Sequence, residues 1–495
     1  MARTLSKRPG TDLSRLRRHA QNHLGVIMTD DMNQVKEFRN NFLDLLDRYY
    51  ESSQYEDLQD WEEAIQQEEY VPIRKRKPRV IYNLAKVLVD KVAAKLVGES
   101  AFPKFIVEDD DDDTAFFRIV QKACRFRRSL ITPIKHLLIS GAVFVRYYII
   151  NGVVKIEYAK SKYCYPVFNA SGELESISIK YVYEDQNDRN TNGTPIQKWY
   201  KIELTKTADI LYDNPVYRAG VRPSFNEVNR AEHGLGWVQG EWFVTHEDKF
   251  DYDGYSLFGD ILGFIDELNY SLSQSSQAAS YNQEPQLIVN NVDEDELERL
   301  VKSSQKAWNL GRQGEAKYLE TDLGAVEAVS NLRDKMRSCA LDVVRIVLHD
   351  PEKMVASAQS GTALGILNAP LVELIDELRT IIEPNTVQLL VKIGMTCLHY
   401  NAMGEETVVI TPPGYVPASI DITTQWPAIF PLTLEDMNKM AQVAQSLSSG
   451  KIVSRESLTR WIASNTPIID NAEEELSKIA AEPDLNPFGT FGGQQ

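Results

Sequence analysis

The stretch YDGYSLFGDILGFIDELNYSLSQSSQAASYNQEP, from Tyr252 to Pro285, decides the fold of this chain. Its first half predicts a helix with one apolar stripe, because the apolar residues recur every three or four positions: Ile261, Leu262, Ile265, Leu268 and Leu272. Its second half is small and polar, and Pro285 stops it; the small residues are Ser273, Ser275, Ser276, Ala278, Ala279 and Ser280. Small residues let helices approach closely, so this half fits packing beside parallel copies of itself or lining a polar passage. The end of a surface helix fits it equally well.

A compact excursion follows this helix and returns to a second one. QLIVN at 286–290 predicts a strand, 293–310 an acidic helix and AKYLE at 316–320 another strand, after a turn with glycines at 311 and 314. Residues 331–348 then repeat apolar positions at helical spacing. The sequence therefore predicts two helices joined by a small unit of some forty residues.

The C-terminal part is helical. HDPEKMVASAQSG at 349–361 predicts a loop, and the long helix after it, to about Asn401, is expected to kink at Pro370 and Pro384. Residues 412–431 predict an extended connector and 433–481 acidic helices. From 405 to 495 there are 12 acidic and 5 basic residues.

The N-terminal part alternates acidic and basic segments. Residues 29–67 predict an acidic helix, and the basic run RKRKPR spans Arg74 to Arg79. The stretch 82–100 predicts an amphipathic helix that ends at Gly98, with Leu84, Val87, Leu88, Lys91, Val92 and Leu96 at helical spacing. The acidic run 108–113 favours a solvated loop over a metal site, because carboxylates on adjacent residues cannot all face one ion. A single helix is expected over 114–140.

Between 142 and 213 the chain is rich in Ile, Val and Tyr. The runs AVFVRYYIING, VKIEYAKSKYCYPVFN, ELESISIKYVYED, IQKWYKIELT and DILYD are broken by Asn-Gly, Ser-Gly and Asn-Asp pairs. This pattern is typical of an antiparallel meander, so the fold class is α+β.

Composition excludes several classes of protein. The 495 residues carry a net charge of −17, the wrong sign for a protein that coats duplex DNA. The four cysteines lie far apart, which argues against a disulfide scaffold and for a reducing compartment. No secretory signal is apparent, and the apolar stretch 137–150 is too short for a membrane span and contains Arg146. There is no phosphate loop, no HExxH and no cofactor motif, so nothing predicts an enzyme, a cofactor or a metal.

The order of elements resembles the portal (head-to-tail connector) proteins of tailed bacteriophages, of the siphophage type. The resemblance covers nearly the whole chain. Four segments carry it: YNLAKVLVDKVAAKLVGES at 82–100, the strand region 139–182, the helix 252–273 and SAQSGTALGI at 357–366. Each motif is loose alone, but the four occur in the family's order and at its intervals.

The resemblance implies a portal-type subunit. Residues 1–28 become a basic arm, 29–256 the wing, 257–284 the first stem helix, 285–329 the clip and 330–349 the second stem helix. Residues 350–360 become the tunnel loop, 361–432 the kinked helix and return to the wing, 433–482 the crown and 483–495 a tail. The basic arm fits either a solvated segment or one that touches a neighbour or nucleic acid.

The function that the resemblance implies is a ring, normally of twelve copies, at one vertex of the capsid in the virion, assembled in the host cytoplasm. Double-stranded DNA passes through its channel during packaging, is retained and is later ejected. The implied partners are the terminase large subunit, the major capsid and scaffolding proteins and the head-completion or adaptor proteins, with no membrane. The terminase hydrolyses ATP, which agrees with the missing phosphate loop.

Three sets of residues are candidates for contacts. The tunnel loop offers Lys353, Met354, Val355, Gln359 and Ser360 to the DNA, and the clip offers Trp308, Arg312 and Lys317 to its partners, since aromatic and Arg side chains anchor interfaces. The basic run offers Arg74, Lys75, Arg76, Lys77 and Arg79 to a neighbouring subunit or to DNA outside the ring.

Two alternatives stay open. One is a head-associated structural or adaptor protein without a DNA channel. The other, less favoured, is a metal-dependent nuclease that uses residues 109–113.

Overall fold

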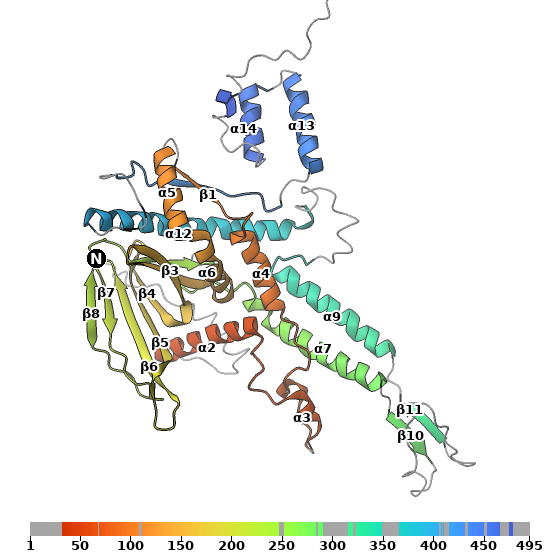
Figure 1. Ribbon diagram of the computed structural model, residues 1–495. Helices are drawn as coiled ribbons and strands as arrows, with labels where there is room; N and C mark the ends of the chain where they lie inside the picture. Colours follow the sequence, from red (N-terminus) through yellow and green to blue (C-terminus); the bar gives the residue numbers. More distant parts are fainter. Residues whose placement is uncertain are drawn as a thin grey trace, which may run out of the picture.

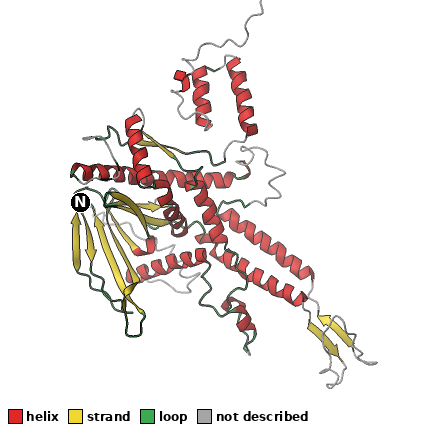
Figure 2. Ribbon diagram, viewed as in Figure 1, coloured by secondary structure: helices red, strands yellow, loops and turns green. Residues whose placement is uncertain are grey.

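The computed structural model describes residues 32–67, 69–107, 111–246, 252–283, 286–290, 315–319, 323–348, 366–404, 407, 409, 415–430, 434–449, 453–465 and 475–478. In these residues it is an α+β protein, as predicted (Figure 2). A mixed helix and sheet body carries a projecting helix pair, α7 (Leu262–Gln283) and α9 (Leu323–Val343), which leads to the hairpin β10 (Gln286–Asn290) and β11 (Glu315–Leu319) (Figure 1).

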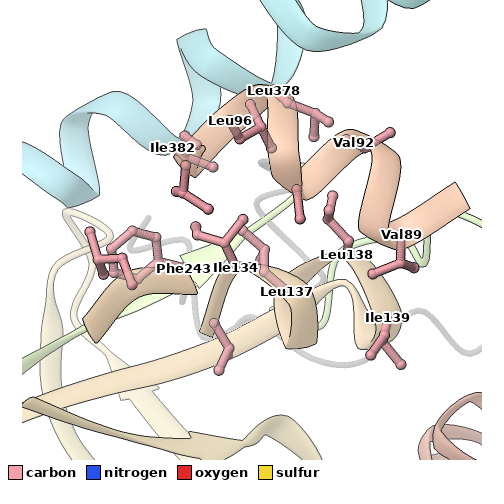
Figure 3. Packing of buried hydrophobic residues seen from close by; sticks show 14 of the residues in the cluster. Val89, Val92, Leu96, Ile134, Leu137, Leu138, Ile139, Phe243, Leu378 and Ile382 are labelled. Atoms are coloured by element: carbon pink, nitrogen blue, oxygen red, sulfur yellow. The ribbon is translucent and has the colours of Figure 1, made fainter. Parts of the chain in front are cut away.

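Three helices form the main core. α4 (Leu84–Val97), α6 (Phe126–Ser140) and α12 (Ala369–Ala402) meet over the strand β9 (Gly240–Val244), and their apolar side chains interlock there (Figure 3). Asn83 caps the N-terminus of α4, because its side chain accepts a hydrogen bond from the Lys86 amide. Gly98 caps the C-terminus, as predicted. The predicted stripe of α4 is buried at Leu84, Leu88, Val92 and Leu96, whereas Val87 is exposed.

The strands between 142 and 244 form two sheets rather than one meander. β4 (Cys164–Phe168), β5 (Leu174–Arg189), β6 (Pro195–Thr205), β7 (Ala208–Tyr212) and β8 (Glu227–Glu232) pair antiparallel in chain order. β2 (Ala142–Ile150) instead lies between β3 (Val153–Lys160) and β9. β8 and β9 were not predicted, because β8 is mostly polar and fully exposed and β9 has only five residues.

Three helix predictions need correction. The helix expected over 114–140 is two helices, α5 (Asp111–Ala123) and α6, because Arg125 takes a left-handed conformation (φ 50°) that ends the first. The helix expected over 29–67 is α2 (Met32–Glu51) and the short α3 (Trp61–Ile65), with Ser52 (φ 63°) at the break. Pro370 begins α12 instead of kinking it, since a first-turn proline loses no helical hydrogen bond, and the helix continues through Pro384.

The acidic run also differs from expectation. Asp111 begins α5, and Asp113 is buried, where its carboxylate accepts hydrogen bonds from the Tyr415 hydroxyl and the Ser419 amide. Those contacts hold the connector against α5 beside the strand pair β1 (Lys104–Val107) and β12 (Ile422–Gln425). Asp113 is therefore a structural residue, and a solvated loop is the wrong description of its part of the run.

The C-terminal helices agree with the predicted helical region. α13 (Leu434–Ser449) and α14 (Arg455–Asn465) pack against each other, apart from the wing in Figure 1.

Two glycines touch where the end of α6 meets the segment that leads into α7. Gly141 (φ 86°) and Gly254 (φ 61°) face each other, and a Cβ on Gly141 would lie 2.6 Å from the Asp253 carbonyl oxygen. Gly172 has the same φ of 86°, but no atom lies within 4 Å of its Cβ position. Only glycine satisfies both the backbone angle and the close approach at 141.

We expect Gly141→Ala to lower the free energy of unfolding by about 1–3 kcal/mol more than Gly172→Ala, because both changes share the backbone strain and only the first adds a clash. Urea unfolding of the two variants measures the difference. Equal losses would show that the contact between the two glycines does not constrain the fold.

Candidate functional site: the stem and the segment that wraps it

The projecting helix α7 carries a polar stripe that the chain's own N-terminal part satisfies. Tyr49 and Tyr55 donate their hydroxyls to Asp266 at 2.7 and 2.5 Å. Further along α7, Asn269, Ser273, Gln277 and Ser280 accept hydrogen bonds from the Tyr82 amide (2.8 Å), the Val80 amide (3.0 Å), the Trp61 indole (3.2 Å) and the Arg79 guanidinium (3.3 Å). We call residues 49–82 the wrap segment.

The wrap segment is what the small, polar half of α7 packs against. Ser273 and Asn269 are both fully buried, although both side chains are polar. The stripe 266, 269, 273, 277 and 280 follows the helical repeat and meets the wrap segment residue by residue. This side of α7 is therefore occupied by its own chain rather than by a copy of itself.

Burial, together with Asp266, the first residue of the stripe, raises the pKa of the three tyrosines around that residue. Burial and the nearby Asp266 carboxylate raise the pKa of Tyr270 to about 12. The same two causes raise the pKa of Tyr49 and of Tyr55 well above the usual range. All three hydroxyls therefore stay protonated at neutral pH; those of Tyr49 and Tyr55 donate to Asp266, and that of Tyr270 lies on the carbonyls of Arg74 and Arg76.

The basic run lies within this wrap, and three of its arginines contact their own chain. Arg74 pairs with Glu267 and stacks on Tyr270, while Arg79 lies 3.3 Å from Glu62. Arg76 is buried between Trp61 and Tyr70 and donates to the Val71 carbonyl.

Arg76 is buried against its own chain, and a contact of this residue with a neighbour or with DNA stays a prediction. Arg74 and Arg79 keep 66% and 40% of their side chains exposed, and Lys75 is exposed. For these residues and for the half-buried Lys77, a contact with a neighbour or with DNA stays a prediction.

A buried ion pair fixes the segment that leads into α7. Arg39 on α2 binds both oxygens of Asp253, at 2.7 and 2.6 Å, and donates to the Ser161 carbonyl at 2.8 Å. The two side chains are 1% and 2% exposed, and the guanidinium stacks on Tyr252 and Tyr165. Sequence analysis missed this pair, because 214 residues separate its members and neither stands in a motif.

Most of the other predicted contact residues lie outside the described residues. This holds for Lys353, Met354, Val355, Gln359 and Ser360 of the tunnel loop, for Trp308 and Arg312 of the clip, and for the basic arm. Lys317 is described: it is exposed on β11, opposite Ile288 of β10.

The described residues contain no group of three or more His, Cys, Asp or Glu that could hold a metal ion. Two of the residues considered for a nuclease site can be checked. Asp113 accepts hydrogen bonds from Tyr415 and Ser419, and Asp109 lies outside the described part. Within the same part, no helix combines the length and the apolar character that crossing a membrane requires.

Comparison with known families decides what the projecting helix pair belongs to. Residues 36–484 match the family described as "Phage portal protein, SPP1 Gp6-like". The chain belongs to this portal protein family. Portal proteins are structural components of the phage particle, not enzymes.

The other comparisons add less. A search of curated proteins finds no match to this portal chain. Two solved chains, described as "Virion of native gene transfer agent (GTA) particle" and "Neck of empty GTA particle computed with C6 symmetry", each share 11% identity over 77% of this chain, with a TM-score of 0.36. The match covers 88% and 89% of those chains. The family match alone carries the assignment.

The buried amide contacts of the wrap segment are testable. Asn269→Leu keeps the volume but leaves the Tyr82 amide without its acceptor, which costs about 1–3 kcal/mol. It also removes the hydrogen bond that the Asn269 amide donates to the Tyr55 hydroxyl, which keeps its contact with Asp266. We expect trypsin to cut the basic run 74–79 faster in this variant, as followed by mass spectrometry. Glu267→Gln is the control, because its contact with Arg74 is exposed and contributes little. Equal cleavage of both variants would contradict the proposed role of the stripe.

Proposed function

We propose that this protein forms a closed ring, normally of twelve copies, at one vertex of the capsid, and that double-stranded DNA passes through its central channel during packaging, retention and ejection. Membership of the portal family supports this proposal. In the ring, α7 and α9 form the stem, the unit around β10 and β11 the clip, and 350–360 the tunnel loop. The clip is the docking platform for the terminase large subunit and the head-completion proteins, and the major capsid and scaffolding proteins surround the wing.

One observation supports the formation of a ring. α9 presents large apolar side chains to solvent, with Val329, Leu332 and Val343 exposed by 37, 56 and 53%, although its other side packs on α7. A projecting helix with an apolar outer face needs a partner, and a neighbouring copy supplies one in a ring that closes by rotation.

The charge of the chain supports a channel that does not hold DNA. A wall dominated by carboxylates repels phosphates, so the duplex slides without the multipoint adhesion that lysines and arginines create. The net charge of −17 agrees with such a wall.

Native mass and negative-stain averages of the full-length protein test the ring. Twelve chains of 56.2 kDa make about 670 kDa, with a central hole in the averages. We expect Val329→Asp with Leu332→Asp to leave single chains, because two charges then face the neighbour. The control, Val221→Asp with Val228→Asp, changes exposed apolar residues of the wing and should keep the ring.

A wild-type protein that stays monomeric even with scaffolding and capsid proteins present would contradict the ring. It would favour the alternative of a head-associated adaptor without a channel.

The tunnel loop has its own test. Shortening 350–360 is expected to leave the ring intact but to impair packaging or retention of DNA, measured as DNA-filled heads after assembly in the host. Failure of the ring to form would contradict the assignment of this segment to the channel.

A further inference from the structure

A basic cluster lies at the junction of α5 and α6, away from the stem. The eleven residues 118–128 (RIVQKACRFRR) hold five cations and no acid, in a chain of net charge −17. The five are Arg118, Lys122, Arg125, Arg127 and Arg128. We call them the junction cluster.

The junction cluster has no acidic partner among the described residues. By contrast, the next cation on α6, Lys135, lies 2.6 Å from Asp90, and Lys198 on β6 lies 3.0 Å from Asp185. Four of the five side chains are exposed and the fifth, Arg127, is half-buried. Five uncompensated like charges repel one another, so a ligand of opposite charge would stabilise them.

The fold gathers these charges around one hollow. Arg125, in its left-handed conformation, turns the chain from α5 into α6, and this turn brings the last turns of α5 beside the first turn of α6. All five side chains line a hollow of about 460 Å³ together with Phe102, Gln121 and Phe126. α6 begins there without a side-chain cap, so the positive end of its dipole adds to the same potential.

The chemistry of the cluster fits phosphates in a row. Four of the five cations are arginines, whose planar guanidinium donates two parallel hydrogen bonds to a phosphate. A single carboxylate would balance one of them, whereas the backbone of duplex DNA presents a charge every 1.7 Å or so of helix axis.

We propose that the junction cluster binds the phosphate backbone of double-stranded DNA on the outside of the wing. This inference deepens the proposed function, because it rests on a ring that has packaged DNA on its outside as well as in its channel. It differs from the channel, whose acidic wall would let DNA slide: the cluster would hold it.

The test measures binding of a 30-base-pair duplex to the full-length protein by fluorescence anisotropy over a series of salt concentrations. The variant Arg118→Gln, Arg125→Gln, Arg128→Gln removes three cations of the cluster. The control Lys155→Gln, Arg218→Gln, Arg222→Gln removes three exposed cations elsewhere on the wing. The two variants therefore have the same net charge.

We expect the cluster variant to bind at least about tenfold more weakly at 50 mM salt, with a slope of log K against log salt that is shallower by about 2–3. The control should bind within about twofold of the wild type. Equal weakening of both variants would overturn the proposal, and so would a wild type that does not bind the duplex at 50 mM salt.

Native mass of the same three proteins separates this proposal from the ring. If the cluster variant alone loses the ring, the cluster binds the acidic surface of a neighbouring copy, and the DNA proposal is wrong. The other outcome is that the wild type forms no ring but binds the duplex, and that only the cluster variant loses this binding. In that case the proposed portal ring is wrong and the DNA site stands.

Discussion

The buried pair of Arg39 and Asp253 is the contact on which the rest of the structure depends. Two charges that are 1% and 2% exposed are stable only while both are present, because removal of one leaves an uncompensated charge and costs about 3–5 kcal/mol. Arg39 belongs to α2, the Ser161 carbonyl to the short 3-10 helix between β3 and β4, and Asp253 to the segment that leads into α7. This one guanidinium therefore sets where α7 begins relative to the sheets, and the contact between Gly141 and Gly254 sits directly beside it.

Beyond this ion pair, the wrap segment adds further contacts between the N-terminal part of the chain and α7. Below Asp253, the polar stripe of α7 is held by residues from 49 to 82, so the first stem helix is enclosed by the N-terminal part of its own chain. Among the described residues nothing covers α9 in this way, and its outer apolar residues are exposed. The two projecting helices thus differ: the polar stripe of α7 is satisfied within the subunit, whereas α9 presents an apolar surface that a neighbour can fill.

Local signals made much of this fold predictable. The apolar repeat of 261–272 predicts α7, and the cap at Gly98 predicts the end of α4. The Asn-Gly and Ser-Gly dipeptides between the strands predict antiparallel pairing. Each of these signals involves only a few adjacent residues. What was missed depends on contacts far apart in sequence. Nothing near Arg39 indicates Asp253, and nothing near Asp113 indicates Tyr415. The break at Arg125 was missed because arginine carries no turn signal, although the run of five cations around it was visible in the sequence.

The wrap segment has a consequence for how the chain is made. Its hydrogen bonds span from 187 to 217 residues, so Tyr55, Trp61 and Tyr82 leave the ribosome long before their partners on α7 exist. At about 5–20 residues per second, that interval is about 10–40 s. During this time, Trp61 and Tyr55 stay without the helix that buries them, and a chaperone that covers aromatic side chains has a defined client segment. α7 is thus available to the wrap segment only when synthesis has passed residue 280, and a chain truncated before that point lacks the helix that its N-terminal part encloses.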